Sequence, residues 1–270
     1  MKYDLIILLI IFLLIIGSAV VGIILINKKR KLRLWMKIVF PISFILVFSI
    51  STVFIYLNIY YHATSEVKPY LKSSELVEVR SREKCYVFDN VSNTETAIVF
   101  YGGAKVEEKS YAPLLYKIAE QGVDVYLVKM PFRFAIFDVS AADLILDNKS
   151  YTNTYLMGHS LGGVAASLCL VRTNLDYKGI IFLAAYPSQK LSNKYKTLSI
   201  YGSKDSVLNM TVYKNHSSYF PKGYKTHVIK GGNHANYGYY GKQLGDQDSS
   251  ISRKDQIDLT VSYIVDFINQ

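Results

Sequence analysis

The chain begins with two long stretches that contain no charged residue. The first covers residues 5–26, which are apolar apart from two glycines and a serine, and the second covers residues 38–61. Each is more than 20 residues long, enough for a helix to cross the roughly 30 Å hydrocarbon core of a bilayer. We therefore expect residues 1–61 to form a two-helix transmembrane hairpin. The alternative is a pair of buried helices in a soluble protein.

The segment between these stretches, residues 27–37, carries six basic residues and no acid. Short basic loops beside membrane helices stay in the cytoplasm. We therefore expect the N-terminus and everything after Tyr61 to lie outside a cell membrane that the chain crosses twice. The first stretch is too long, and its start too poor in basic residues, for a typical cleaved signal peptide.

After Tyr61 the pattern changes. Residues 62–84 are polar and charged, which predicts a linker. From residue 85 onward, short apolar runs alternate with segments of helical spacing. The runs are almost continuously apolar, which is typical of a parallel sheet covered on both faces, so we expect one α/β domain over residues 85–270. Strands are expected at 85–91, 96–101, 123–129, 154–157, 179–185, 198–201 and 226–230. Helices are expected at 111–121, 141–146, 161–172, 207–215 and 255–268.

Charge and composition narrow the function further. The chain has 270 residues and a net charge of +10, but seven basic residues and one acid lie in residues 1–61. The remaining surplus of four positive charges is too small to indicate a nucleic-acid partner. The five histidines lack metal-ligand spacing, and no glycine-rich phosphate motif precedes a helix. The two cysteines, Cys85 and Cys169, do not make a disulfide framework. We therefore expect no metal and no cofactor.

The motif that carries chemistry is Gly-His-Ser-Leu-Gly over residues 158–162, placed between an apolar strand and a helix. A serine hydroxyl is a weak nucleophile unless a sharp turn presents it to a base. Gly158 and Gly162 supply the clearance that such a turn needs. The N–H of Leu161, at the start of the helix, can then stabilise a developing oxyanion.

Further candidates follow other strands of the predicted sheet. Asp205 ends the segment Gly-Ser-Lys-Asp, and His234 ends Gly-Gly-Asn-His. Gly102, Gly103 and Ala104 follow an early strand. Active groups of a parallel sheet gather at the carboxyl ends of its strands, so we expect these residues to meet there.

Serine, aspartate and histidine in this chain order, with an early glycine loop, resemble the α/β-hydrolase family. Residues 86–270 look like a compact α/β-hydrolase, similar to small esterases and dienelactone-hydrolase-like proteins. Dienelactone hydrolases themselves use cysteine as the nucleophile, so Ser160 moves this chain toward the serine members. The resemblance implies a triad of Ser160, His234 and Asp205 that works through an acyl-enzyme. It also implies two oxyanion donors, the Leu161 N–H and the N–H of Gly103 or Ala104. The early loop, Tyr101-Gly102-Gly103-Ala104, contains fewer glycines than the corresponding loop of lipases.

These observations favour a membrane-anchored serine hydrolase, most simply a carboxylic ester hydrolase with a small-molecule or lipid-like ester as substrate. The alternatives are an inactive hydrolase fold used as a binding module, or an acyltransferase or peptidase with the same triad.

Only residues 185–197 separate two late strands, too few for a helical lid, so Ser160 is expected to be open. His159 is expected to be structural. Tyr237, Tyr239 and Tyr240 either line an acyl pocket or pack their loop, and the oligomeric state stays open.

Overall fold

The computed structural model describes residues 12, 15–17, 19, 22, 34–92, 94–146 and 150–270. The chain divides into two compact units, Met1–Tyr60 and Tyr61–Gln270. In the first unit, helix α2 (Leu34–Asn58) leaves Ile45, Val47 and Ile50 about three-fifths exposed. A helix with both the length and the apolar character for a membrane crossing is not found among the described residues, so the predicted hairpin is not supported. Most of the first predicted span, and of the basic loop, lies outside the described residues.

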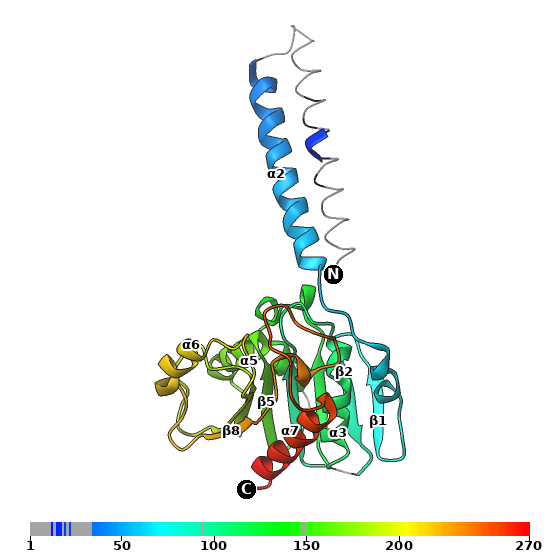
Figure 1. Cartoon of the computed structure of the whole chain (residues 1–270), viewed down its shortest axis with the longest axis vertical. Coiled ribbons are helices and arrows are strands. Elements are labelled where there is room, and N and C mark those ends of the chain that lie inside the picture. Colours follow the sequence, from blue (N-terminus) through cyan, green and yellow to red (C-terminus); the bar gives the residue numbers. More distant parts are fainter. Residues whose placement is uncertain are drawn as a thin grey trace. The chain divides into compact units, whose positions relative to one another are not determined.

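The described residues of the second unit form one eight-stranded sheet in the order β1-β2-β4-β3-β5-β6-β7-β8 (Figure 1). The pairs β1–β2 and β2–β4 are antiparallel, and every other neighbouring pair is parallel. The mostly parallel α/β sheet predicted from the apolar runs is confirmed. The strands are β1 (Val77–Ser81), β2 (Cys85–Asn90), β3 (Thr96–Tyr101), β4 (Asp124–Val128), β5 (Asn153–His159), β6 (Gly179–Leu183), β7 (Lys196–Gly202) and β8 (Lys225–Ile229).

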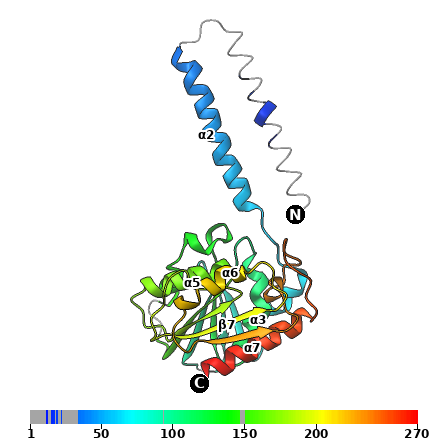
Figure 2. The ribbon, with the colours of Figure 1, turned by 60° about the vertical axis from the view of Figure 1, so that its left-hand side comes forward.

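Helices cover both faces of this sheet, with α7 on one side of β7 and α5 and α6 on the other (Figure 2). The α-helices of this unit are α3 (Ala112–Ala119), α4 (Ala141–Leu146), α5 (Leu161–Arg172), α6 (Met210–Asn215) and α7 (Arg253–Ile268). Short 3-10 helices are η1 (Ser65–Leu71), η2 (Glu108–Tyr111), η3 (Pro131–Arg133), η4 (Ala135–Phe137), η5 (Ser217–Tyr219) and η6 (Ala235–Tyr237).

The continuous apolar strands are explained by two separate cores. In β3, Ile98 and Phe100 face the core that α3 and α7 cover. Val99 and Tyr101, from the same strand, face the core that α4, α5 and α6 cover. Because successive side chains point to opposite faces of a sheet, a central strand buried on both sides must be apolar at every position.

The predicted linker over residues 62–84 is wrong, because this stretch is part of the folded unit. It contains η1 and the edge strand β1, which pairs with β2 from Val77 to Ser81. Upstream of them, the N–H of Tyr61 donates to the carbonyl of Lys105 at 2.7 Å. In β1 only Val77 is buried, and the other four side chains are half-buried or exposed. An edge strand with so few buried positions has the composition of a linker.

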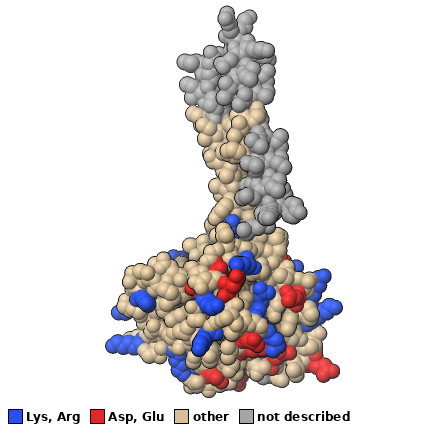
Figure 3. All heavy atoms as spheres, in the orientation of Figure 1, with Lys and Arg blue, Asp and Glu red and all other residues tan. Residues whose placement is uncertain are grey.

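On the face of this unit visible in Figure 3, basic and acidic side chains are interspersed. No continuous basic stripe of the kind that tracks a phosphate backbone is visible on that face. This distribution agrees with the small charge surplus of the residues after Tyr61.

The position of α5 depends on two glycines that allow main chains to touch. A Cβ on Gly158 would lie 2.4 Å from the main chain of Gly162 and Gly163. A Cβ on Gly162 would lie 2.2 Å from the carbonyl oxygen of Tyr101. The first turn of α5 therefore rests directly on the ends of β3 and β5, which confirms the clearance predicted for the motif.

We expect Gly162→Ala to lower the free energy of unfolding by about 3 kcal/mol or more, because the new methyl group meets rigid main-chain atoms. Gly122→Ala is the matched control. Its φ of +85° is unfavourable for alanine, but no atom lies within 4 Å of the added Cβ, so it should cost only about 1 kcal/mol. Urea unfolding of the full chain measures both, and equal losses would show that the close packing does not matter.

Candidate active site

Ser160 occupies the sharp turn between β5 and α5. Its backbone has φ +53° and ψ −126°, a conformation that residues with a side chain seldom adopt. Its N–H donates to the carbonyl of Leu183 at 2.9 Å, which ties the turn to the end of β6. This conformation is that of a strained turn which lifts a nucleophile above the sheet.

Asp205 and His234 meet although 29 residues separate them. The His234 Nδ1 lies 2.8 Å from the Asp205 Oδ2, and both side chains are 1% exposed. The other carboxylate oxygen, Oδ1, accepts the N–H groups of Val207 and Leu208 at 3.0 and 2.8 Å. These bonds fix the carboxylate, and the carboxylate in turn fixes the imidazole. The His234 Nε2 is buried and forms no hydrogen bond within the described residues.

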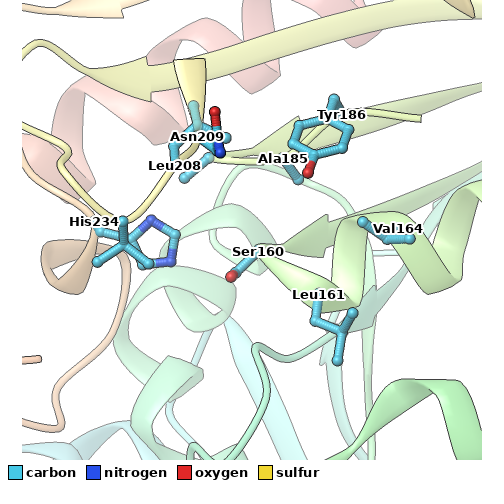
Figure 4. A pocket seen from close by; sticks show the side chains of 10 residues that line it. Ser160, Leu161, Val164, Ala185, Tyr186, Leu208, Asn209 and His234 are labelled. Atoms are coloured by element: carbon cyan, nitrogen blue, oxygen red, sulfur yellow. The ribbon is translucent and has the colours of Figure 1, made fainter. Parts of the chain in front are cut away.

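Ser160 and His234 line one pocket of about 220 Å³. Figure 4 shows the Ser160 hydroxyl extending toward the side of the pocket on which His234 lies. The predicted serine, aspartate and histidine are thus gathered at the carboxyl ends of their strands. The remaining lining residues are mostly apolar and come from α5 and from the loops after β6 and β7: Leu161, Val164, Ala184, Ala185, Tyr186, Val207, Leu208 and Asn209.

The loop between β6 and β7 places no helix over the pocket. Residues 184–195, between β6 and β7, contain no helix. Within that loop Ala184 has φ +48° and lines the pocket. Ser160 itself is half-buried. The prediction of an uncovered serine is confirmed for this loop.

The predicted oxyanion donors differ in their hydrogen bonds. The Leu161 N–H, at the first position of α5, and the Ala104 N–H have no main-chain or side-chain acceptor among the described residues. The Gly103 N–H, in contrast, donates to the Tyr111 hydroxyl at 2.9 Å. The Gly103 N–H is therefore already used within the fold, whereas the Ala104 N–H is not.

The tyrosines after His234 pack their loop. Tyr237 and Tyr240 are buried in the core that α3 and α7 cover, and Tyr239 packs against it. None of the three lines the pocket beside Ser160. Of the two interpretations left open, packing is the one that the structure supports.

Two buried polar residues that the sequence analysis did not single out hold the histidine loop. The Asp246 carboxylate accepts the Ala235 N–H at 2.9 Å and the Ser206 N–H at 3.3 Å, which joins the loops of His234 and Asp205. Gln256 of α7 bonds both main-chain groups of Asn233, at 3.0 and 2.8 Å. The sequence signal that could have pointed to Gln256 is its place next to Ile257, where a polar residue joins the apolar positions of a helix that packs into the core.

Comparison with known proteins agrees with this geometry. A model of the alpha/beta hydrolase family matches residues 97–258, more than half of the chain. The protein belongs to the alpha/beta hydrolase family. The match includes Ser160, Asp205 and His234. A search of curated proteins finds no match.

Several solved structures share the fold of this hydrolase. Carboxyl esterase 2 of the fungus Tuber melanosporum is 12% identical with a TM-score of 0.52, covering 77% of this chain and 91% of its own. The Francisella virulence factor BioJ is 13% identical with a TM-score of 0.53, covering 76% and 88%. Est1E of Butyrivibrio proteoclasticus is 13% identical with a TM-score of 0.50, covering 72% and 99%. At these identities the likeness shows the fold alone.

A second histidine lies within the site of this hydrolase. The rings of His159 and His234 have centroids 4.5 Å apart, and His159 also faces Tyr111 and Tyr237. Burial, followed by the charge of a protonated His234, lowers the pKa of His159 well below its usual range. His159 is therefore neutral in the folded protein near pH 7, which suits the structural role expected of it.

We expect His159 to make the fold less stable in mild acid. The unfolded chain takes up a proton on this residue below about pH 6.5, whereas the folded chain does not, so stability is full above that pH and falls as the pH drops. In His159→Asn, the free energy of unfolding should decline less steeply between about pH 7 and pH 5 than in the unaltered full chain. The difference in slope should approach the contribution of one bound proton. Equal slopes in the two proteins would contradict this assignment.

Proposed function

We propose that the protein is a serine hydrolase that cleaves carboxylic esters through an acyl-enzyme. The observation that carries the proposal is the buried pair of His234 and Asp205, which opens onto the same pocket as the strained Ser160. A nucleophile, a base and a residue that orients the base are the three parts that acyl transfer needs. The family match and the esterase neighbours support the same chemistry.

In the first step, the Ser160 Oγ attacks the ester carbonyl while the His234 Nε2 takes the hydroxyl proton. The Asp205 carboxylate accepts a hydrogen bond from the His234 Nδ1–H and stabilises the imidazolium that forms. The carbonyl oxygen becomes an oxyanion and accepts hydrogen bonds from the N–H of Leu161 and of Ala104. Collapse of this intermediate breaks the bond to the alcohol, which leaves with the proton from His234.

In the second step, water takes the place of the alcohol. His234 removes a proton from the water, the resulting hydroxide attacks the acyl carbonyl, and the acid departs as Ser160 recovers its proton. The pocket beside Ser160 takes the acyl group, because Val164, Val207 and Leu208 give it an apolar wall. Its volume of about 220 Å³ fits an uncharged acyl group of modest size. The loop between β6 and β7 adds no helical lid to this pocket, which suits a small-molecule or lipid-like ester.

A fluorophosphonate probe should label the unaltered protein and fail to label Ser160→Ala, because the probe reacts only with an activated serine. Asp205→Asn and His234→Ala should each lower kcat for a chromogenic ester by about 10⁴-fold, since the base loses its orientation or is absent. His227→Ala, in the outer strand β8, is the control and should retain full activity. An unlabelled wild-type protein would sink the proposal and favour an inactive binding module.

We also propose that residues 1–61 hold the hydrolase domain at the outer face of the cell membrane. The support lies in the sequence: two uncharged stretches separated by a segment with six basic residues. The exposed apolar side chains of α2 agree with an apolar environment. Within the part of the chain that the structure describes, no helix long and apolar enough to span a membrane adds to this support.

Thiol labelling in intact cells tests this location. A cysteine at Lys29→Cys should resist an impermeant thiol reagent, whereas one at the exposed Lys190→Cys should react. The unaltered chain should give little background, because Cys85 and Cys169 are buried, and burial raises the pKa of Cys169 to about 12. Labelling at position 29 with protection at position 190 would invert the proposed orientation, and equal labelling of both would refute it.

A further inference from the structure

A buried chain of hydrogen bonds runs behind the candidate active site and has no part in the steps above. The Gly103 N–H donates to the Tyr111 hydroxyl at 2.9 Å, and that hydroxyl lies 2.9 Å from the His159 Nδ1. Tyr111 is fully buried, and His159 nearly so. The chain therefore joins the loop after β3 to the residue directly before Ser160.

The groups of this chain are neutral. Burial raises the pKa of the Tyr111 phenol and lowers that of His159. A phenol oxygen can accept two hydrogen bonds, so the Tyr111 oxygen accepts the Gly103 N–H in either tautomer of His159. The Gly103 N–H is therefore held whichever ring nitrogen of His159 carries the proton.

The space around Gly103 is matched to this arrangement. A Cβ at this position would lie 2.8 Å from the His159 Nδ1 and 2.9 Å from the Tyr111 hydroxyl. The start of α5 also holds the loop, because Gly162 packs against the main chain of Tyr101 and Gly102. Residue 103 is therefore fixed by contacts on two sides.

Tyr111 is anchored as firmly as the loop that it holds. Its ring packs against Phe100 with centroids 4.9 Å apart, and against Tyr240 of the histidine loop at 6.4 Å. The neighbouring Ser110 carbonyl accepts the Tyr239 N–H at 2.7 Å. Tyr111 thus sits where the oxyanion loop, the nucleophile turn and the histidine loop converge.

We propose that Tyr111 and His159 are positioning residues that clamp Gly103, so that the next N–H along the chain, that of Ala104, serves as the second oxyanion donor. The proposal rests on the proposed hydrolase function. A donor assists only where the oxyanion forms, and a preset orientation avoids the cost of turning a peptide group during the reaction. The clamp supplies that preset orientation by using up the Gly103 N–H.

Tyr111→Phe tests the proposal, because it removes the hydroxyl and keeps the ring packed. Tyr116→Phe is the control, because it makes the same change at another buried tyrosine, which lies in α3. We expect Tyr111→Phe to lower kcat by about tenfold or more, toward the roughly 10²–10³-fold loss seen when one oxyanion donor is removed. KM should change less than about twofold. The inhibition constant of a trifluoromethyl ketone, which forms an oxyanion on the serine, should rise by the same factor as kcat falls.

The folded fraction at the assay temperature and the pH profile of kcat separate positioning from folding. The Gly103 N–H left unpaired in Tyr111→Phe should lower the melting temperature, but the protein should stay fully folded in the assay, with the pH profile of Tyr116→Phe. If kcat and the inhibition constant are unchanged, or if the loss of kcat is matched by a loss of the folded fraction, the clamp has no positioning role. A wild-type protein that no fluorophosphonate labels would remove the proposed function and this proposal together. Labelling of Tyr111→Phe with full activity would remove this proposal alone.

Discussion

The contact of the first turn of α5 with the ends of β3 and β5 is the constraint on which the rest of the site depends. Main-chain atoms of residues 101, 158 and 162 lie so close that a single methyl group on either glycine could not be placed. This contact holds Ser160 in its positive-φ conformation at the start of the helix. A serine turn held by main-chain packing cannot relax its strain without separating the helix from the sheet.

The histidine side of the site is held differently, by buried hydrogen bonds between loops. Asp246 bonds the N–H groups of Ser206 and Ala235, and Gln256 bonds both main-chain groups of Asn233. His234 lies between the two attachment points. The loops that carry Asp205 and His234 are irregular, so buried side chains satisfy main-chain groups that strands would otherwise pair. A rigid turn at Ser160 thus shares the pocket with a histidine loop whose geometry is specified by a few polar side chains.

The parallel sheet and the meeting of Ser160, Asp205 and His234 could be predicted because each depends on local patterns. Apolar runs mark central strands, and the carboxyl ends of parallel strands share one edge. Strand β1 was missed because Val77 is its only buried side chain, and polar residues at an edge look like a linker. The use of the Gly103 N–H was also out of reach. It depends on Tyr111 and His159, which are 48 residues apart and are brought together only by tertiary packing.

The two neighbouring histidines show how surroundings decide the use of one residue type. His234 has the Asp205 carboxylate 2.8 Å from Nδ1, so a positive charge formed on its ring in the proposed acyl transfer would be balanced at once. His159, whose ring centroid is 4.5 Å away, has a neutral phenol at the corresponding nitrogen and is fully enclosed. A charge on His159 would be uncompensated and would oppose a charge on His234. Keeping His159 neutral therefore leaves the positive charge of the proposed reaction to His234, and lets His159 serve as a fixed hydrogen-bond partner of Tyr111, which in turn holds the loop after β3.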